Sequence, residues 1–183
     1  AKVRAAASDI NPQSRFGADI MSRVDYAVRQ DSGTLTRLIR GKVYELILRL
    51  LDKQTCTADR IVLVGNTVMQ HLFCGFDLSP LSMYPFESPN SGQVNLTPET
   101  LNWPLEGDPE IVFMPCIGGF VGSDILAGLL ASGMHKSDKI TCLIDLGTNG
   151  EIAVGDRDQI LCASTAAGPA FEGGHVSCGV PAV

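Results

Sequence analysis

The residues best suited to chemistry lie at 143–151, where the sequence reads Leu-Ile-Asp-Leu-Gly-Thr-Asn-Gly-Glu. Asp145 ends an apolar stretch, and a carboxylate at the end of a strand can hold a hydrated Mg²⁺ ion. Gly147 and Gly150 carry no Cβ, so their backbone N–H groups can approach a phosphate closely. Hydroxyl and amide donors complete the segment: Thr148 and Asn149. The pattern favours one half of a clamp around nucleotide phosphates, and the alternative is an ordinary hairpin with an Asn-Gly turn.

Further acidic residues stand beside glycine turns. Asp124 begins a predicted helix, where it either complements the helix dipole or orients a water molecule or metal ion at a cleft. Glu151 and Glu172 each adjoin a glycine-rich turn, as a general base or as a side chain that holds the turn through a backbone hydrogen bond. The candidate catalytic residues are Asp145 and Asp124, and Asp145 is also the candidate metal ligand.

Two more glycine turns are candidate ligand contacts. Gly65, Asn66 and Thr67 join a strand to a helix, where they are either a helix cap alone or a cap whose N–H and hydroxyl groups face a phosphate or substrate. His71, one turn later, is more typical of a core or interface residue than of a catalytic one. The other turn, at 166–174, follows the third strand of a small predicted sheet, and it contains Gly168, Glu172 and Gly173.

Composition excludes several classes of protein. The 183 residues carry a net charge of −6, which disfavours a nucleic-acid surface. No apolar run approaches the roughly 20 residues that span a bilayer, and no signal peptide is visible. The six cysteines form no CxxC pair, which disfavours a zinc or iron–sulfur site in this chain and favours reduced, buried thiols in a cytoplasmic protein. No Walker lysine motif and no Gly-x-Ser-x-Gly elbow occur.

The elements that position these residues follow from the apolar pattern. Residues 2–7 are expected to form a short strand, and apolar spacing predicts helices at 18–30 and 34–53. Two units of one design come next: a strand at 60–64 feeds a helix at 68–73, and a strand at 111–114 feeds a helix at 123–132. Uniformly apolar strands that each lead into a helix indicate a parallel sheet covered by helices. Ligands bind such sheets at the carboxyl ends of the strands.

The chain divides into two predicted lobes. Residues 1–137 are assigned to the first lobe, with a proline-rich excursion at 77–109 that is a lid, an interface arm or a mobile segment. Residues 138–183 are assigned to the beginning of a second lobe. Three short apolar runs there, joined by polar turns, predict an antiparallel meander, and they lie at 139–145, 151–155 and 159–165.

Several motifs occur together in one order along the chain. They are Asn11-Pro12-Gln13 with Phe16-Gly17-Ala18-Asp19-Ile20 and Ser22-Arg23, Val64–Met69 with His71-Leu72, Gly119–Asp124, Asp145–Glu151 and Ala167–Gly173. The Asp145 motif resembles the second phosphate motif of the superfamily of acetate and sugar kinases, Hsp70 and actin. The whole set resembles the reductive activators of corrinoid proteins. The resemblance implies an actin-like (ribonuclease H-like) α/β fold, with a mixed sheet flanked by helices and the antiparallel start of a second lobe.

The resemblance also implies a function. Such an activator uses ATP and Mg²⁺, with one electron from a 2Fe-2S ferredoxin domain, to return a Co(II) corrinoid protein to Co(I). The partner would be a corrinoid iron–sulfur or methyltransferase protein, and no binding to nucleic acid or membrane is expected. A homodimer is possible. The ferredoxin domain, a first phosphate motif of the form Asp-x-Gly-Thr-Thr and the adenosine-binding glycines are expected outside this chain. A fragment with weak or no ATP binding of its own is therefore expected. The alternatives are a small-molecule kinase of the same superfamily and a non-catalytic docking module.

Overall fold

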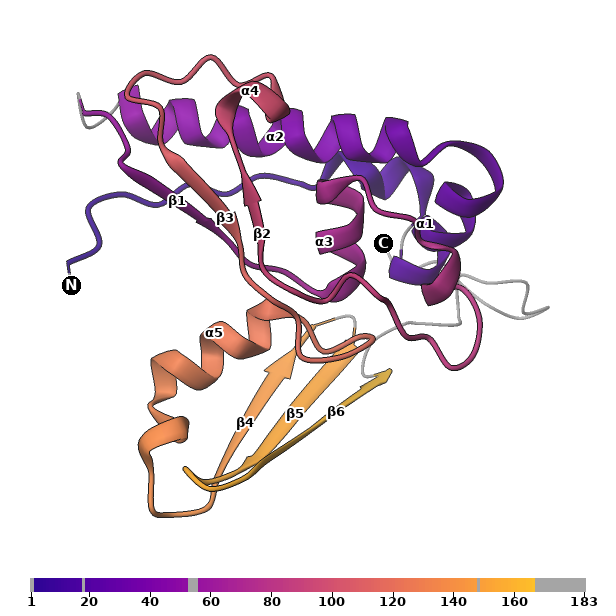
Figure 1. Cartoon of the computed structure of the whole chain (residues 1–183), viewed down its shortest axis with the longest axis vertical. Helices are drawn as coiled ribbons and strands as arrows, with labels where there is room; N and C mark the ends of the chain where they lie inside the picture. Colours follow the sequence, from indigo (N-terminus) through magenta and orange to yellow (C-terminus); the bar gives the residue numbers. More distant parts are fainter. Residues whose placement is uncertain (1, 18, 53–55, 148, 167–183) are drawn as a thin grey trace.

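The computed structural model describes residues 2–17, 19–52, 56–147 and 149–166 (Figure 1). Its helices are α1 Ile20–Tyr26, α2 Ser32–Asp52, α3 Thr67–Cys74, α4 Pro98–Leu101 and α5 Ser123–Ser132. Its strands are β1 Arg60–Leu63, β2 Val94–Leu96, β3 Glu110–Phe113, β4 Thr141–Leu146, β5 Asn149–Gly155 and β6 Ile160–Ala166. Among these described residues, none of the helices is long and apolar enough to cross a membrane.

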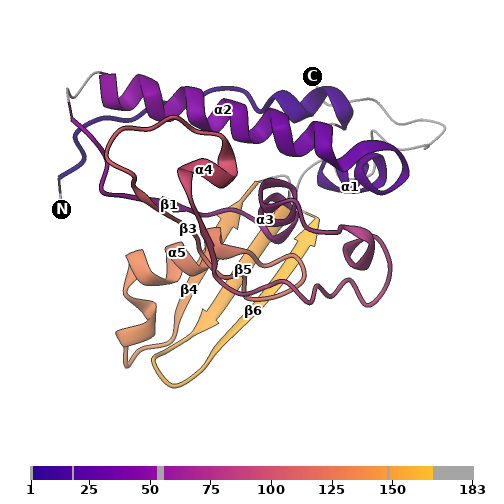
Figure 2. The same ribbon diagram turned by 45° about the horizontal axis from the view of Figure 1, so that its top comes forward.

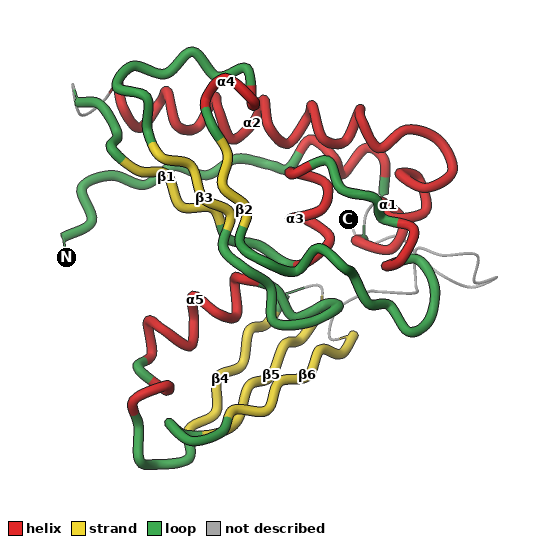
Figure 3. The backbone as a smooth tube through the Cα atoms, in the orientation of Figure 1, coloured by secondary structure: helices red, strands yellow, loops and turns green. Residues whose placement is uncertain are grey.

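The elements form two groups, each with its own sheet. In Figure 1 the upper group contains α1 to α4 and the sheet β1-β3-β2, and the lower group contains α5 and the sheet β4-β5-β6. Figure 3 shows that the two sheets are joined through loops rather than through a shared strand. The expected α/β architecture, with a mixed sheet and an antiparallel meander, is confirmed.

The first sheet is mixed because β1 pairs in parallel with β3, whereas β2 pairs antiparallel with the other side of β3. The central residues Ile111, Val112 and Phe113 are buried in succession. The strand β2 was not predicted, since it is only three residues long and lies inside the proline-rich excursion. The strand expected at 2–7 is wrong: the residues described there carry no regular secondary structure.

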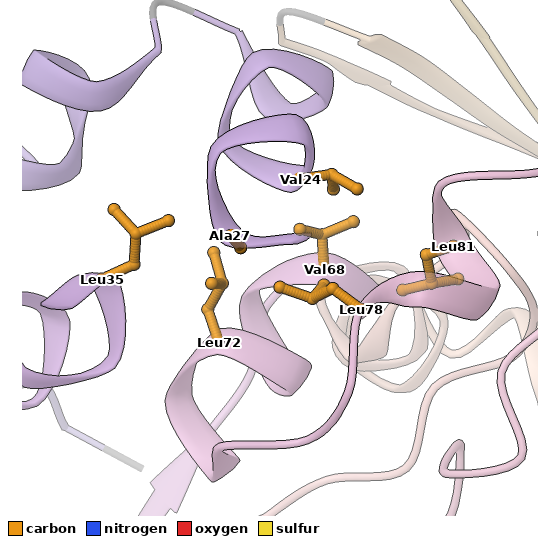
Figure 4. Close-up of a cluster of buried hydrophobic side chains, with 7 residues drawn as sticks. All are labelled: Val24, Ala27, Leu35, Val68, Leu72, Leu78 and Leu81. Carbon is orange, nitrogen blue, oxygen red and sulfur yellow. The ribbon is translucent and has the colours of Figure 1, made fainter. Parts of the chain in front are cut away.

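Helices α1, α2 and α3 meet in an apolar cluster (Figure 4). The cluster consists of Val24, Ala27, Leu35, Val68, Leu72, Leu78 and Leu81. Leu78 and Leu81 belong to the excursion, which therefore packs into the core at its first turn. Burying each of the larger aliphatic side chains stabilises the fold by about 1.5–3 kcal/mol.

Polar side chains of α3 hold the rest of the excursion. The Nε2 of Gln70 donates to the carbonyl oxygens of Gly92 and Met114, at 3.0 and 3.2 Å. The ring of His71 contacts the backbone oxygen of Thr67 through Nδ1 and the hydroxyl of Ser88 through Nε2. His71 is fully buried. Its position agrees with the interpretation of a core histidine.

The second sheet is an antiparallel meander with α5 on one face, as Figure 2 shows from a second direction. Val121, Ile125, Leu129 and Met134 form a cluster with the buried Ala153 of β5. Helix α5 was expected to cover the parallel strands of the first sheet, and it packs on the second sheet instead. The division of the chain at residue 138 stays a prediction.

One expectation about cysteines needs correction. Cys142 stands in an apolar strand pattern but is exposed, because it occupies the face of β4 opposite to α5. Cys74, Cys116 and Cys162 are half-buried. Among the described residues, no group of three His, Cys, Asp or Glu side chains is arranged to hold a metal ion.

Candidate functional site

In the second sheet, the strand register places polar side chains at one end of the face that α5 covers. On the inner face Leu143 lies opposite Ala153, beneath α5. Two residues further, Asp145 lies opposite Glu151, and Glu151 lies opposite Ser164 on β6. The hydroxyl of Ser164 donates to Oε1 of Glu151 at 3.0 Å. Because alternate residues share a face, the surface that is apolar beneath the helix becomes polar where the helix begins.

The starts of α3 and α5 are joined by backbone contacts. The N–H of Ser123 donates to the oxygen of Gly65 at 2.9 Å, and the N–H of Gly65 donates to the hydroxyl of Ser123 at 3.1 Å. Gly122 leaves no room for a side chain, since a Cβ there would lie 2.2 Å from the oxygen of Gly65. This close approach brings Asn66, which caps α3, near Asp124 in the first turn of α5.

The segment before α1 forms another wall. Asn11 accepts a hydrogen bond from the N–H of Gln13 at 2.9 Å and so caps a short 3-10 turn. Asp19 caps α1, with one carboxylate oxygen accepting from the N–H of Ser22 at 2.8 Å and the other from its hydroxyl at 2.6 Å. These bonds fix both polar side chains at the ends of their turns.

The walls enclose a cleft of about 230 Å³. Its lining residues are Asn11, Asp19, Ile20, Arg23, Asn66, Met69, Asp124, Asp145, Gly147, Asn149 and Glu151. A larger hollow, of about 920 Å³, lies between the end of α2 and residues 104–106. We assign the functional site to the smaller cleft, because four separate segments of the chain bring polar side chains together there.

The cleft is rich in negative charge. Burial raises the pKa of Asp124; the N–H of Ile125 opposes this, and the charge of Asp145 adds to it. Burial also raises the pKa of Glu151; the hydrogen bond from Ser164 opposes this, and the charges of Asp124 and Asp145 add to it. Like-charged carboxylates that lie near one another repel. A bound cation would relieve this repulsion.

Asp19 differs from the other acids of the cleft. Burial by itself would raise the pKa of Asp19, but the hydrogen bonds from Ser22 outweigh burial and hold that pKa below its ordinary value. Asp19 is therefore a negative charge held in place by the first turn of α1.

The structure brings six of the residues singled out from the sequence into this cleft. They are Asn66, Asp124, Asp145, Gly147, Asn149 and Glu151. Three others lie outside its lining. The N–H of Gly65 donates to the hydroxyl of Ser123, and Gly150 is buried within the sheet. Thr67 is fully buried, and its hydroxyl donates to the oxygen of Gly118 at 2.7 Å. Thr148, Gly168, Glu172 and Gly173 lie outside the described residues.

The sequence did not indicate that the segment before and within α1 lines the cleft. Asn11, Asp19 and Arg23 stood out in the sequence only as parts of a motif. A local signal existed, since Asn and Asp each preceded a predicted turn or helix, where such residues act as caps. That signal predicts the two helix caps. It does not predict that both capping side chains face the same cleft.

The arrangement has the chemistry of a phosphate and cation site. A carboxylate such as that of Asp145 suits a hard, hydrated cation, and the amides of Asn66 and Asn149 supply donors. No histidine, cysteine or serine nucleophile lines the described cleft.

Comparisons with known proteins identify the family of this chain. A family model described as the RACo middle region matches residues 1–137, and a model of the C-terminal ASKHA domain of RACo matches residues 139–183. The chain is 37% identical, over 94% of its length, to the corrinoid activation enzyme RamQ of Eubacterium limosum. It is 27% identical, over 90% of its length, to a [Co(II) methylated amine-specific corrinoid protein] reductase of Methanosarcina barkeri.

A solved structure of a reductive activator for a corrinoid, iron–sulfur protein superposes on the whole chain with a TM-score of 0.85 and 30% identity. The fold is therefore actin-like. The chain spans only about a third of these proteins, 30% of the first relative, 32% of the second and 30% of the solved chain. On the match over residues 1–137, the chain belongs to the RACo family.

Proposed function

We propose that this chain forms the phosphate-binding part of an ATP-dependent reductive activator of a corrinoid protein. The activator returns Co(II) in its partner to Co(I), using one electron from a reduced 2Fe-2S cluster that lies outside the chain. The cluster is oxidised as the cobalt is reduced, and ATP hydrolysis to ADP and phosphate drives the transfer. The names of the two relatives and of the solved structure support this choice of reaction.

The observation that carries the proposal is the convergence of Asp145, Asn66 and Asp124 in one cleft. They come from a hairpin and from two helix starts that are far apart in the sequence. Backbone N–H groups at a helix start, a glycine-containing turn and a carboxylate are the groups that bind a nucleotide's phosphates and their metal ion.

The donor set fits Mg²⁺. This ion keeps several water ligands and binds to protein through one or two carboxylates, which the cleft offers at Asp145 and Asp124. We propose Asp145 as the residue that holds the hydrated ion, which would neutralise phosphate charge when bound. Asp124, half-buried at the start of α5, would orient water at the phosphate end of the cleft.

Hydrolysis is proposed to act through conformation. A ligand shifts an equilibrium only by the difference of its affinities for two states. The cleft wall from α1 and the wall from β4 and β5 belong to different groups of elements. A nucleotide that contacts both walls therefore favours their closed arrangement. We propose that residues 1–137 form part of the first lobe and that residues 138–183 begin the second.

The test is reduction of a Co(II) corrinoid protein by the intact protein, followed by visible absorption with and without Mg-ATP. Replacing Asp145 with Ala is expected to abolish the stimulation by ATP, because the metal-bound phosphates lose their anchor. Asp158→Ala is the matched control. Asp158 is an exposed carboxylate in the turn at the far end of the same sheet, where it forms an ion pair with Arg157.

Unchanged ATP stimulation in Asp145→Ala would remove that residue from the proposed role. An intact protein that phosphorylates a small molecule and leaves Co(II) unreduced would instead support the kinase alternative. An intact protein that binds the partner but does not hydrolyse ATP would support the docking alternative.

A further inference from the structure

Arg23 is the one cation among the described residues that line the cleft. It lies in α1 and is half-buried. Four carboxylates line the same space: Asp19, Asp124, Asp145 and Glu151. In a cleft lined by negative charges, this single guanidinium would attract an anion that binds there.

The position of Arg23 is fixed by the turn before α1. Its Nε donates to the carbonyl oxygen of Gly17 at 3.0 Å. Gly17 packs closely against the first turn of α1, because a Cβ at this position would lie 2.7 Å from Cβ of Ser22 and 2.9 Å from the backbone nitrogen of Arg23. The guanidinium is therefore anchored at Nε.

The local charges keep this side chain ionised. Burial lowers the pKa of Arg23, and the charge of Asp19 opposes that effect. Arginine stays protonated at any physiological pH. Because both oxygens of Asp19 accept hydrogen bonds from Ser22, Asp19 supports the charge of Arg23 from a fixed place.

A charge balance indicates what Arg23 does. The phosphates of ATP are strongly negative, and they would enter a space lined by carboxylates. Asp145 would hold a metal ion at the hairpin wall, and that ion would offset part of the repulsion there. The wall from α1 has Arg23, whose planar guanidinium suits phosphate oxygens.

We propose that Arg23 contacts the terminal phosphate of ATP and stabilises the charge that develops there during hydrolysis. This inference rests on the proposed function. An arginine that contacts the transferred phosphoryl group raises the rate of hydrolysis in other nucleotide-hydrolysing proteins by stabilising charge in the transition state. In this chain the arginine would come from the same polypeptide, from helix α1, which lines the cleft together with the hairpin of Asp145.

The experiment uses the intact protein with Arg23→Ala and Arg23→Lys. Arg29→Ala is the matched control, since Arg29 follows two turns later and makes an exposed ion pair with Asp25 at 2.6 Å. Steady-state ATP hydrolysis gives kcat and KM. Isothermal titration gives the affinities for Mg-ATP and Mg-ADP.

Arg23→Ala is expected to lower kcat on the order of 10³-fold. The affinity for Mg-ATP should fall while that for Mg-ADP changes less than about 3-fold, because ADP lacks the phosphate that Arg23 contacts. Arg23→Lys should keep an intermediate kcat, since it retains the charge but not the fork of donors. Arg29→Ala should behave as the wild type.

A kcat within about 3-fold of the wild type in Arg23→Ala would overturn the inference, as would equal losses of affinity for ATP and ADP, which a purely structural role predicts. If Arg23→Ala does not fold, Arg23→Lys decides by the ratio of its ATP and ADP affinities. Wild-type protein that neither binds nor hydrolyses Mg-ATP would overturn the proposed function itself, and this inference with it.

Discussion

The central strands of the two sheets differ in burial. In β3 of the first sheet, Ile111, Val112 and Phe113 are buried in succession. In β5 of the second sheet burial alternates: Ala153 is buried, whereas Ile152 and Val154 are 37% and 39% exposed. A strand that is buried on both faces reads as a continuous apolar run, and one that is buried on a single face alternates.

The outer face of the second sheet carries a row of large apolar side chains. The row consists of Ile144, Leu146, Ile152, Val154 and Leu161, and Leu146 and Leu161 are 80% and 67% exposed. An apolar surface of this kind is typical of a site of contact with more protein. The comparison teaches that the central strand of the first sheet is buried on both faces within the described chain, whereas the central strand of the second is buried on one.

The first prediction concerns the core beneath α2. Phe73→Ala in the 183-residue chain is expected to lower the free energy of unfolding by about 3–5 kcal/mol, because it leaves a cavity among buried rings. Phe73 is 2% exposed and its ring contacts Trp103 and Phe113 at centroid distances of 5.9 and 5.7 Å. Chemical denaturation measures the loss. A loss below about 1 kcal/mol would mean that the first sheet is not the stable half of the comparison.

Much of the fold follows from the sequence. The strands at 60–63 and 110–113 and the helices α2, α3 and α5 lie close to where apolar periodicity predicted them. Each has a long or uniform pattern that local structure can satisfy alone. The turn at Asp145 was recognised because glycine, a carboxylate and polar donors stand together in a few residues.

The rest depends on contacts that no local pattern reports. Helix α5 follows β3 in the chain but packs on β4 and β5. Its apolar stripe could cover either sheet, so the sequence does not decide between them. By its residue type, Thr67 suited a helix cap and a ligand donor equally well. In the structure its hydroxyl donates to the oxygen of Gly118 instead, a contact between segments 51 residues apart in the sequence. Arg23 became a site residue only because α1 folds against the cleft.

The second prediction concerns the outer row. Leu161→Ser is expected to change the free energy of unfolding by less than about 0.5 kcal/mol, since exposed positions away from special features tolerate substitution. It should also reduce self-association of the 183-residue chain, because it breaks the apolar patch. Denaturation and analytical ultracentrifugation measure the two effects. A destabilisation as large as that of Phe73→Ala would show that the outer row is covered in solution and would erase the contrast between the sheets.

The third and smallest effect is a pH dependence confined to the first group of elements. Burial lowers the pKa of His71, although the oxygen of Thr67 and the charge of Asp77 oppose this. In the unfolded chain the same ring binds a proton at the ordinary pKa of histidine, about 6.5, while the folded chain resists protonation. Stability is therefore complete above about pH 6.5 and falls as the pH drops below that value, down to the folded pKa.

His71→Gln tests this dependence against His135→Gln, which leaves the buried ring in place. The denaturation midpoint should be lower at about pH 5.5 than at about pH 7.5 in the wild type and in His135→Gln, and should change less in His71→Gln. Protonation places a positive charge on the buried ring and removes the acceptor that Nε2 offers to the hydroxyl of Ser88. Acid should therefore loosen the excursion from α3 while leaving the second sheet intact. The same pH slope in all three proteins would show that the buried ring of His71 is not its source; the raised pKa values of Asp124 and Glu151 give those carboxylates the opposite slope.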